Sequence, residues 1–118
     1  MLRMGCAFLP VADPRASARW FADTFDLVVT EVDEWSAQLS LPGDDATSVT
    51  LLGPASGIPA EPGLPFATFS LVATELDGLR DRLVAAGHEV EPVAGDADVC
   101  RFFTLNDLDG NTLLVVDR

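Results

Sequence analysis

The sequence predicts an α+β fold in which two β-α-β-β-β modules form a curved mixed sheet with a concave cleft and with the helices outside. Three observations support this prediction. The two halves of the 118-residue chain follow the same order of strand-like and helical patterns. A Pro- and Gly-rich segment at 54–64 lies between the halves. The Asp-, Asn- and Gly-rich run 106–111 separates two apolar runs and predicts a hairpin at the C-terminal edge of a sheet. By length the chain is expected to form a single domain, with module 1 at about 1–53, the linker at 54–64 and module 2 at about 65–118.

In the first module, alternating side chains predict a strand over residues 2–12. Asp13 suits a helix N-cap and Pro14 suits the first helical position, so we expect a helix that begins there and ends near Asp26. Three further strand-like stretches complete the module, at about 27–32, 35–42 and 47–53.

The second module repeats the plan. Residues 65–73 alternate as a strand, and 75–77 begin a helix whose apolar side chains recur at helical spacing up to a capping Gly87. Three strands are expected after this helix, at about 88–93, 99–105 and 112–117.

Composition excludes several classes of function. The formal net charge of −12 disfavours nucleic acid as a partner, because phosphates would be repelled. No apolar run approaches the roughly 18 residues of a membrane span, and the N-terminus lacks the layout of a signal peptide, so we expect a cytoplasmic protein without a membrane partner. Cys6 and Cys100 form no C-x-x-C pair, and both lie in apolar runs, which predicts buried free thiols.

Four short segments together resemble the vicinal oxygen chelate superfamily, which includes glyoxalase I, extradiol dioxygenases, fosfomycin-resistance enzymes and bleomycin-resistance proteins. They are Pro-Val-Ala-Asp at 10–13, Trp-Phe-Ala-Asp at 20–23, Ala-Ala-Gly at 85–87, and the Phe-x-x-x-Asp-x-Asp-Gly-Asn run at 103–111. The last of these is the most specific. The resemblance covers essentially the whole chain and implies paired β-α-β-β-β modules, but no particular reaction, because this fold hosts both enzymes and binders.

Enzymes of that superfamily hold a divalent metal with His, Glu or Gln side chains from four strands. The resemblance places the corresponding positions at Cys6, Thr50, Thr68 and Leu114. Leu cannot ligate a metal, and Thr hydroxyls are poor ligands for hard or borderline divalent ions. We therefore expect neither a metal at these positions nor any other cofactor.

Strand alternation directs a set of apolar and hydroxyl side chains toward the expected cleft. The predicted ligand-binding residues are Phe8, Trp35, Thr50, Thr68, Ser70, Arg101, Phe103 and Leu114. For three of them an alternative stays open, since Phe8 could also pack in a core. Trp35 either forms a wall of the cleft or packs in a core, and Arg101 either binds an anionic ligand group or pairs with an acidic side chain.

These observations favour a metal-free small-molecule binder that resembles the bleomycin-resistance proteins, which sequester a drug without altering it. The expected ligand is cationic or aromatic, and the resemblance implies a homodimer. One alternative is a glyoxalase-like lyase or isomerase, or a dioxygenase, with an atypical site that uses Asp98, His88 or Glu34. His88 is otherwise an exposed loop histidine. A second alternative is an interaction module without a pocket.

Overall fold

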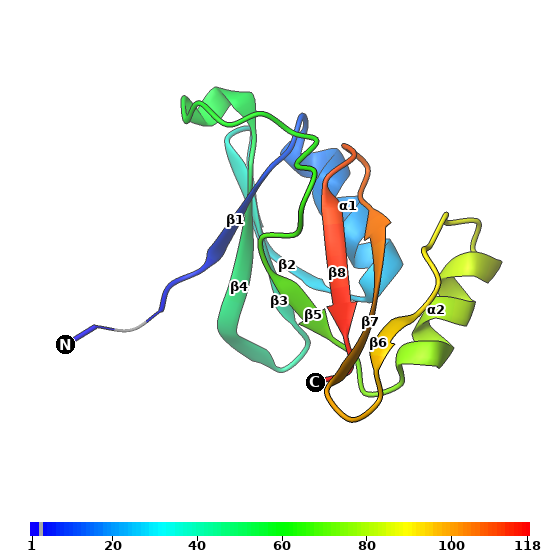
Figure 1. The fold of residues 1–118 in the computed structure, drawn as a ribbon. Coiled ribbons are helices and arrows are strands. Elements are labelled where there is room, and N and C mark those ends of the chain that lie inside the picture. The colour runs from blue at the N-terminus through cyan, green and yellow to red at the C-terminus, as the bar shows by residue number, and fades with distance from the viewer. Residues whose placement is uncertain (3) are drawn as a thin grey trace. The chain divides into compact units, whose positions relative to one another are not determined.

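A computed structural model of the chain describes residues 1–2, 4–44 and 47–118. The chain divides into two compact units, Met1–Gly63 and Leu64–Arg118. Each unit contains one long helix and one four-stranded mixed sheet, in the order β-α-β-β-β (Figure 1). The predicted α+β fold with two β-α-β-β-β modules is thereby confirmed. No helix in the described part of the chain has the length and apolar character that crossing a membrane requires.

The sheet of the first unit has the strand order β1-β4-β3-β2, with β1 parallel to β4 and the other pairs antiparallel. Its elements are β1 (Ala7–Pro10), α1 (Pro14–Phe25), β2 (Val28–Val32), β3 (Ser36–Leu41) and β4 (Asp44–Leu52). The predicted linker contains a short 3-10 turn, η1 (Pro54–Ser56).

The strand expected over 2–12 is wrong in length, since β1 covers only Ala7–Pro10. Pairing with β4 begins at Ala7, opposite Val49, and Met4 before it is almost fully exposed. Alternation alone therefore does not make a strand where no partner strand pairs with it. Arg3, which belongs to the same prediction, lies outside the described residues.

Helix α1 has the predicted bounds. The Asp13 carboxylate accepts hydrogen bonds from the N–H groups of Arg15, at 3.0 Å, and Ala16, at 3.4 Å, and so caps the first turn. The helix ends at Asp26, whose left-handed φ of 58° turns the chain toward β2. One helix face is buried against the sheet through Pro14, Ser17, Ala18 and Phe21. The sheet side of this core consists of buried side chains of three strands: Leu9, Ala37, Leu39 and Leu51.

The sheet of the second unit has the strand order β5-β8-β7-β6, again with one parallel pair, β5 with β8. Its elements are β5 (Ser70–Val72), α2 (Leu76–Ala85), β6 (Ala94–Asp96), β7 (Cys100–Asn106) and β8 (Thr112–Val116). The end of α2 follows the prediction. Gly87 has φ +96°, its N–H donates to the Val84 carbonyl, and the next N–H, of His88, donates to the Leu83 carbonyl, as in a Schellman motif.

Two strand predictions in this unit need correction. The expected strand 88–93 is reduced to one bridge between Val90 and Leu105, and β6 begins only at Ala94. The Arg80 guanidinium donates hydrogen bonds to the carbonyls of Val90 and Glu91, at 3.0 and 2.8 Å. It thereby replaces a neighbouring strand as the partner of these carbonyls. A proline follows at position 92 and has no N–H to donate.

The expected strand 65–73 is likewise too long, because β5 covers only Ser70–Val72. The segment before it is held by the β7–β8 hairpin instead. The N–H of Leu64 donates to Asn111 Oδ1 and its carbonyl accepts from the N–H of Thr112, both at 2.9 Å. Pro65, next in the chain, cannot donate to a ladder.

The predicted hairpin turn is confirmed, and it is organised by one buried carboxylate. Asp107 accepts from the N–H groups of Asp109 and Asn111, at 2.9 and 2.8 Å, and from Asn111 Nδ2 at 3.0 Å. Asn111 is 0% exposed and Asp107 7% exposed. The Asp-x-Asp-Gly-Asn pattern thus forms a buried polar network that also fixes Leu64.

Candidate ligand-binding faces

In each unit the helix covers one face of the sheet and leaves the other uncovered by that helix; we call the second one the helix-free face. In unit 1 the alternation is clear. Leu9, Ala37 and Leu51 are buried on the helix side. Phe8, Gln38 and Thr50 alternate with them on the helix-free face. The strand register places Thr50 between the other two, paired with Phe8 on β1 and with Gln38 on β3.

The helix-free face of unit 1 carries polar side chains that contact one another. The Thr50 hydroxyl lies 3.2 Å from Cys6 Sγ, so two of the positions implied by the family resemblance are neighbours. Gln38 Nε2 donates to Ser48 Oγ at 3.1 Å. Sequence reasoning missed Gln38, although it is the polar residue between Ala37 and Leu39 in a segment predicted to alternate. That position was the signal that could have found it.

Trp35 does not lie beside Phe8 and Thr50 in the register. It occupies the turn between β2 and β3, one residue before β3. Alternation places it on the same side of the sheet as Ala37, which is the helix side. The turn is held by Asp33, whose carboxylate accepts the N–H groups of Trp35, at 2.8 Å, and Ser36, at 2.9 Å. These N–H groups, that of Ser36 most of all, hold the pKa of Asp33 below its usual value. Since 58% of Trp35 is exposed, it is not part of a packed core.

In unit 2 the register brings Ser70, Leu114 and Thr104 together on the helix-free face, in one row across β5, β8 and β7. A second row contains Val72, Val116 and Phe102. Of the predicted unit 2 residues, Ser70 and Leu114 lie here. Thr68 precedes β5 and lies outside any strand, so its predicted place on the same strand face is wrong.

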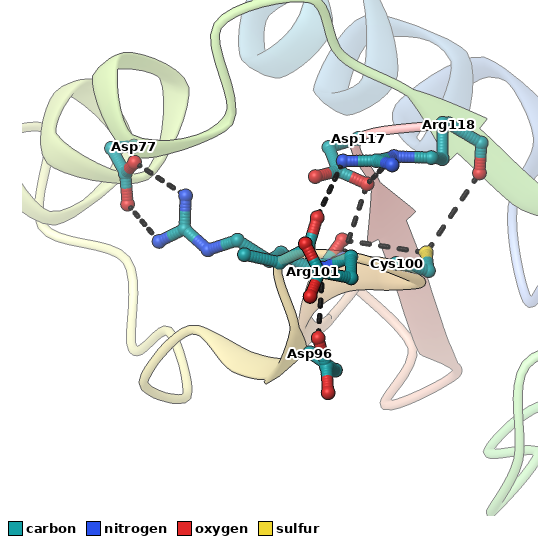
Figure 2. Close-up of polar contacts among 8 residues, drawn as sticks. Asp77, Asp96, Cys100, Arg101, Asp117 and Arg118 are labelled. Atoms are coloured by element: carbon teal, nitrogen blue, oxygen red, sulfur yellow. Dashed lines mark hydrogen bonds and ion pairs between the residues drawn. The ribbon is translucent and has the colours of Figure 1, made fainter.

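Phe103 and Arg101 also lie on β7, but on the helix side of the sheet rather than on the helix-free face. Phe103 is 1% exposed and belongs to the core beneath α2, which corrects its prediction as a ligand-binding residue. The Arg101 guanidinium forms a bidentate ion pair with Asp77 at the start of α2, with both N–O distances at 3.0 Å (Figure 2). This hydrogen bonding with Arg101 lowers the pKa of Asp77 and raises that of Arg101. Of the two alternatives for Arg101, the structure therefore contains the acidic side-chain pair.

The C-terminal residues complete this polar cluster. The N–H of Arg101 donates to Asp117 Oδ1 at 3.1 Å, and Arg118 pairs with the same carboxylate at 3.3 Å (Figure 2). Arg118 also donates to the Ala97 carbonyl at 2.9 Å, and Cys100 Sγ lies 3.8 Å from the Arg118 carbonyl. Both cysteines are free but only half-buried, which corrects the expectation of buried thiols. The cluster ties the C-terminus to the turn between β6 and β7.

The chemistry of the donor set does not fit a divalent metal. Cys6 and Thr50 lie together, but a thiol and a neutral hydroxyl lack the charge and ligand number that such an ion needs. Leu114 offers no donor atom. In the part of the chain that the structure describes, no group of three His, Cys, Asp or Glu side chains could hold a metal ion. His88 is half-buried rather than exposed, and its N–H donates to the Leu83 carbonyl in the motif that ends α2.

Comparison with known proteins places this architecture in a family. The model of the Glyoxalase/Bleomycin resistance protein/Dioxygenase superfamily matches residues 3–115. The chain belongs to this superfamily. No curated protein matches the sequence significantly.

Solved structures with the same fold include a superfamily member from Sphaerobacter thermophilus, with a TM-score of 0.81 at 19% identity, covering 98% of this chain and 97% of that one. TnmS3, an antibiotic binding protein from Streptomyces sp. CB03234, has a TM-score of 0.81 at 18% identity, with 98% and 94% covered. Lactoylglutathione lyase from Agrobacterium tumefaciens has a TM-score of 0.77 at 17% identity, with 97% and 92% covered. At these identities the likeness shows the fold, which binders and enzymes share.

Proposed function

We propose that this superfamily member is a metal-free small-molecule-binding protein that holds its ligand on a helix-free sheet face without altering it, as a drug-sequestering resistance protein does. The donor set carries the proposal. Cys6, Thr50, Thr68 and Leu114 stand where the family resemblance implies metal ligands, and they cannot together bind a divalent ion. Without a metal, the lyase, isomerase and dioxygenase chemistry implied by the resemblance has no centre, whereas ligand binding needs none.

The side chains of these faces suit an aromatic ligand with a hydrogen-bonding edge. Phe8, 53% exposed, offers a ring for stacking, and Thr50 and Gln38 beside it offer hydroxyl and amide groups. Ser70 and Thr104 flank the apolar Leu114 in unit 2. The formal net charge of −12 favours the approach of a cation over that of an anion.

A fluorescence titration tests the proposal. The chain contains two tryptophans, and the exposed Trp35 can report on bound aromatic compounds. We expect metal-free bleomycin, or another aromatic cation from a small panel, to change this emission saturably and to be recovered unchanged afterwards. Phe8→Ala should weaken binding at least about fivefold, as expected for the loss of one aromatic contact. Phe66→Ala, which also removes an exposed ring, is the matched control.

Three results would overturn this function. One is the absence of a response to every compound of the panel. Another is turnover of the bound compound. The third is zinc, nickel, manganese or iron at one equivalent in protein purified without chelators and analysed by mass spectrometry.

The assembly proposed for this function follows the superfamily resemblance, and the proposed location is the one expected from the sequence. We propose that the chain is a cytoplasmic homodimer. Light scattering coupled to gel filtration should give twice the 12.5 kDa mass of the chain, and a monomer at micromolar concentration would contradict the dimer.

A further inference from the structure

The edge strand β2 contains a β-bulge that changes the face of the sheet on which Glu31 lies. Val29 pairs with Leu39 and Glu31 pairs with Gln38, so Thr30 is one extra residue between the two pairs. The Thr30 hydroxyl donates to the Gln38 carbonyl at 3.2 Å and anchors the bulge. In a regular strand, residue 31 would share the side of residue 29, where the partner Leu39 is 1% exposed. The bulge instead puts Glu31 in register with Gln38 on the helix-free face.

Glu31 thereby completes a row that crosses every strand of the unit 1 sheet. The register gives Phe8, Thr50, Gln38 and Glu31 in that order, from β1 to β2. With neighbouring strands about 4.8 Å apart, the row is roughly 14 Å long. It has an exposed aromatic ring at one end and an exposed carboxylate at the other, with the half-buried hydroxyl and amide between them. Among the residues that the structure describes, Glu31 forms no ion pair.

We propose that Glu31 is a specificity-determining residue of this face: its carboxylate binds the positively charged group of an aromatic cation whose ring lies toward Phe8. The inference rests on the proposed function and deepens it. It assigns the sign of the ligand's charge and the end of the row that binds the charged group. A carboxylate that has no basic partner among the described residues, at the end of a row of uncharged side chains, favours a cation and repels an anion.

Two probes with the same ring system test this assignment. 9-Aminoacridine is a cation at pH 7, and acridine-9-carboxylate is an anion. We expect the wild-type protein to bind the cation at least about tenfold more tightly. Glu31→Gln keeps the shape and removes the charge, and should weaken binding of the cation about fivefold while leaving the anion unchanged or slightly tighter. Glu34→Gln is the matched control, because Glu34 is also exposed but lies in the turn outside the strands.

Deletion of Thr30 tests the bulge itself. Removing the extra residue makes Glu31 follow Val29 directly and leaves it opposite Gln38, so the preference for the cation should persist, as should the ring-dependent affinity that Phe8→Ala weakens. A folded deletion variant without the preference would contradict the register that places Glu31 on this face. Circular dichroism checks the fold of this variant, and the glutamine variant tests the assignment if the deletion does not fold. Equal effects of Glu31→Gln and Glu34→Gln, or no preference between the probes, would overturn the role of Glu31 alone. If neither probe bound the wild type, and no compound of the titration panel did, the proposed function would fail as well.

Discussion

The two units share one element order and are stabilised in different ways. In unit 1 the helix buries Pro14, Ser17, Ala18 and Phe21, and the Phe21 ring lies edge-on to that of Trp20 at 5.0 Å. In unit 2 the helix buries only Leu76 and Leu83. Polar interactions are concentrated there instead, in the Asp107–Asn111 network, the Arg80 bonds and the Asp77–Arg101 pair.

This difference shows that a repeated topology does not require repeated energetics. Both units bury apolar side chains, but the helix of unit 1 buries more residues than that of unit 2, whereas unit 2 adds hydrogen bonds and charges whose geometry must be maintained. The four predictions below test this contrast, from the largest expected effect to the smallest.

The largest effect is expected in the core of unit 1. Phe21 is 1% exposed, so Phe21→Ala should lower the free energy of unfolding by about 3–5 kcal/mol through lost burial and the cavity left behind. Urea denaturation followed by circular dichroism measures it. Phe25→Ala, on the same helix but half-buried, should cost clearly less. Equal losses in the two variants would show that burial beneath α1 does not dominate this unit.

The second effect tests the polar network of unit 2. Asn111→Ala leaves the buried Asp107 carboxylate and the Leu64 N–H each without one hydrogen-bond partner, and should cost about 2–3 kcal/mol. Asn106→Ala, an exposed neighbour in the same turn region, should change stability by less than about 0.5 kcal/mol. Hydrogen exchange of the Leu64 and Thr112 amides should accelerate in the first variant. Unchanged protection would mean that the network does not fix this segment.

The third effect compares the two helix ends. Both have a left-handed residue, Asp26 with φ 58° and Gly87 with φ +96°. Asp26→Gly should stabilise the protein and Gly87→Ala should destabilise it, each by about 1 kcal/mol, because a side chain is disfavoured in this conformation. Gly78→Ala within α2 is the control, with the opposite sign to Gly87→Ala, since alanine is the better helix former at an ordinary helical position. Thermal unfolding of the three variants would contradict this explanation if both alanine substitutions destabilised equally.

Sequence reasoning predicted what depends on local pattern. Asp13 as N-cap, Gly87 as the end of α2 and the hairpin at 106–111 follow from backbone chemistry that neighbouring residues determine, and all three are confirmed. The failures depend on distant partners. Nothing near 88–93 reveals that Arg80 takes the carbonyls of Val90 and Glu91, and so replaces a strand.

The candidate site shows the same limit. The side of a strand on which a residue lies follows from its register, and one inserted residue changes it, as Thr30 does for Glu31. Phe103 and Leu105 are two residues apart on one predicted strand, so they lie on the same side of it, and both are buried. This spacing is visible in the sequence and would have placed Phe103 in the core. The arrangement of the two modules as one domain stays a prediction.

The smallest effect concerns the Asp77–Arg101 pair of unit 2. The hydrogen bond with Arg101 lowers the pKa of Asp77 in the folded protein, so the pair's contribution is complete above the ordinary pKa of an aspartate and is lost as the pH falls through the lowered folded value. Asp77→Asn should therefore be less stable than wild type near neutral pH, and the difference should shrink in acid and in high salt, since both groups are exposed to solvent. Urea unfolding at several pH values measures this difference, and Asp81→Asn on the same helix controls for the loss of one charge from an acidic chain. If the two variants showed the same pH dependence, the acid sensitivity of unit 2 would come from net charge rather than from this pair, and the contrast between the units would be one of packing alone.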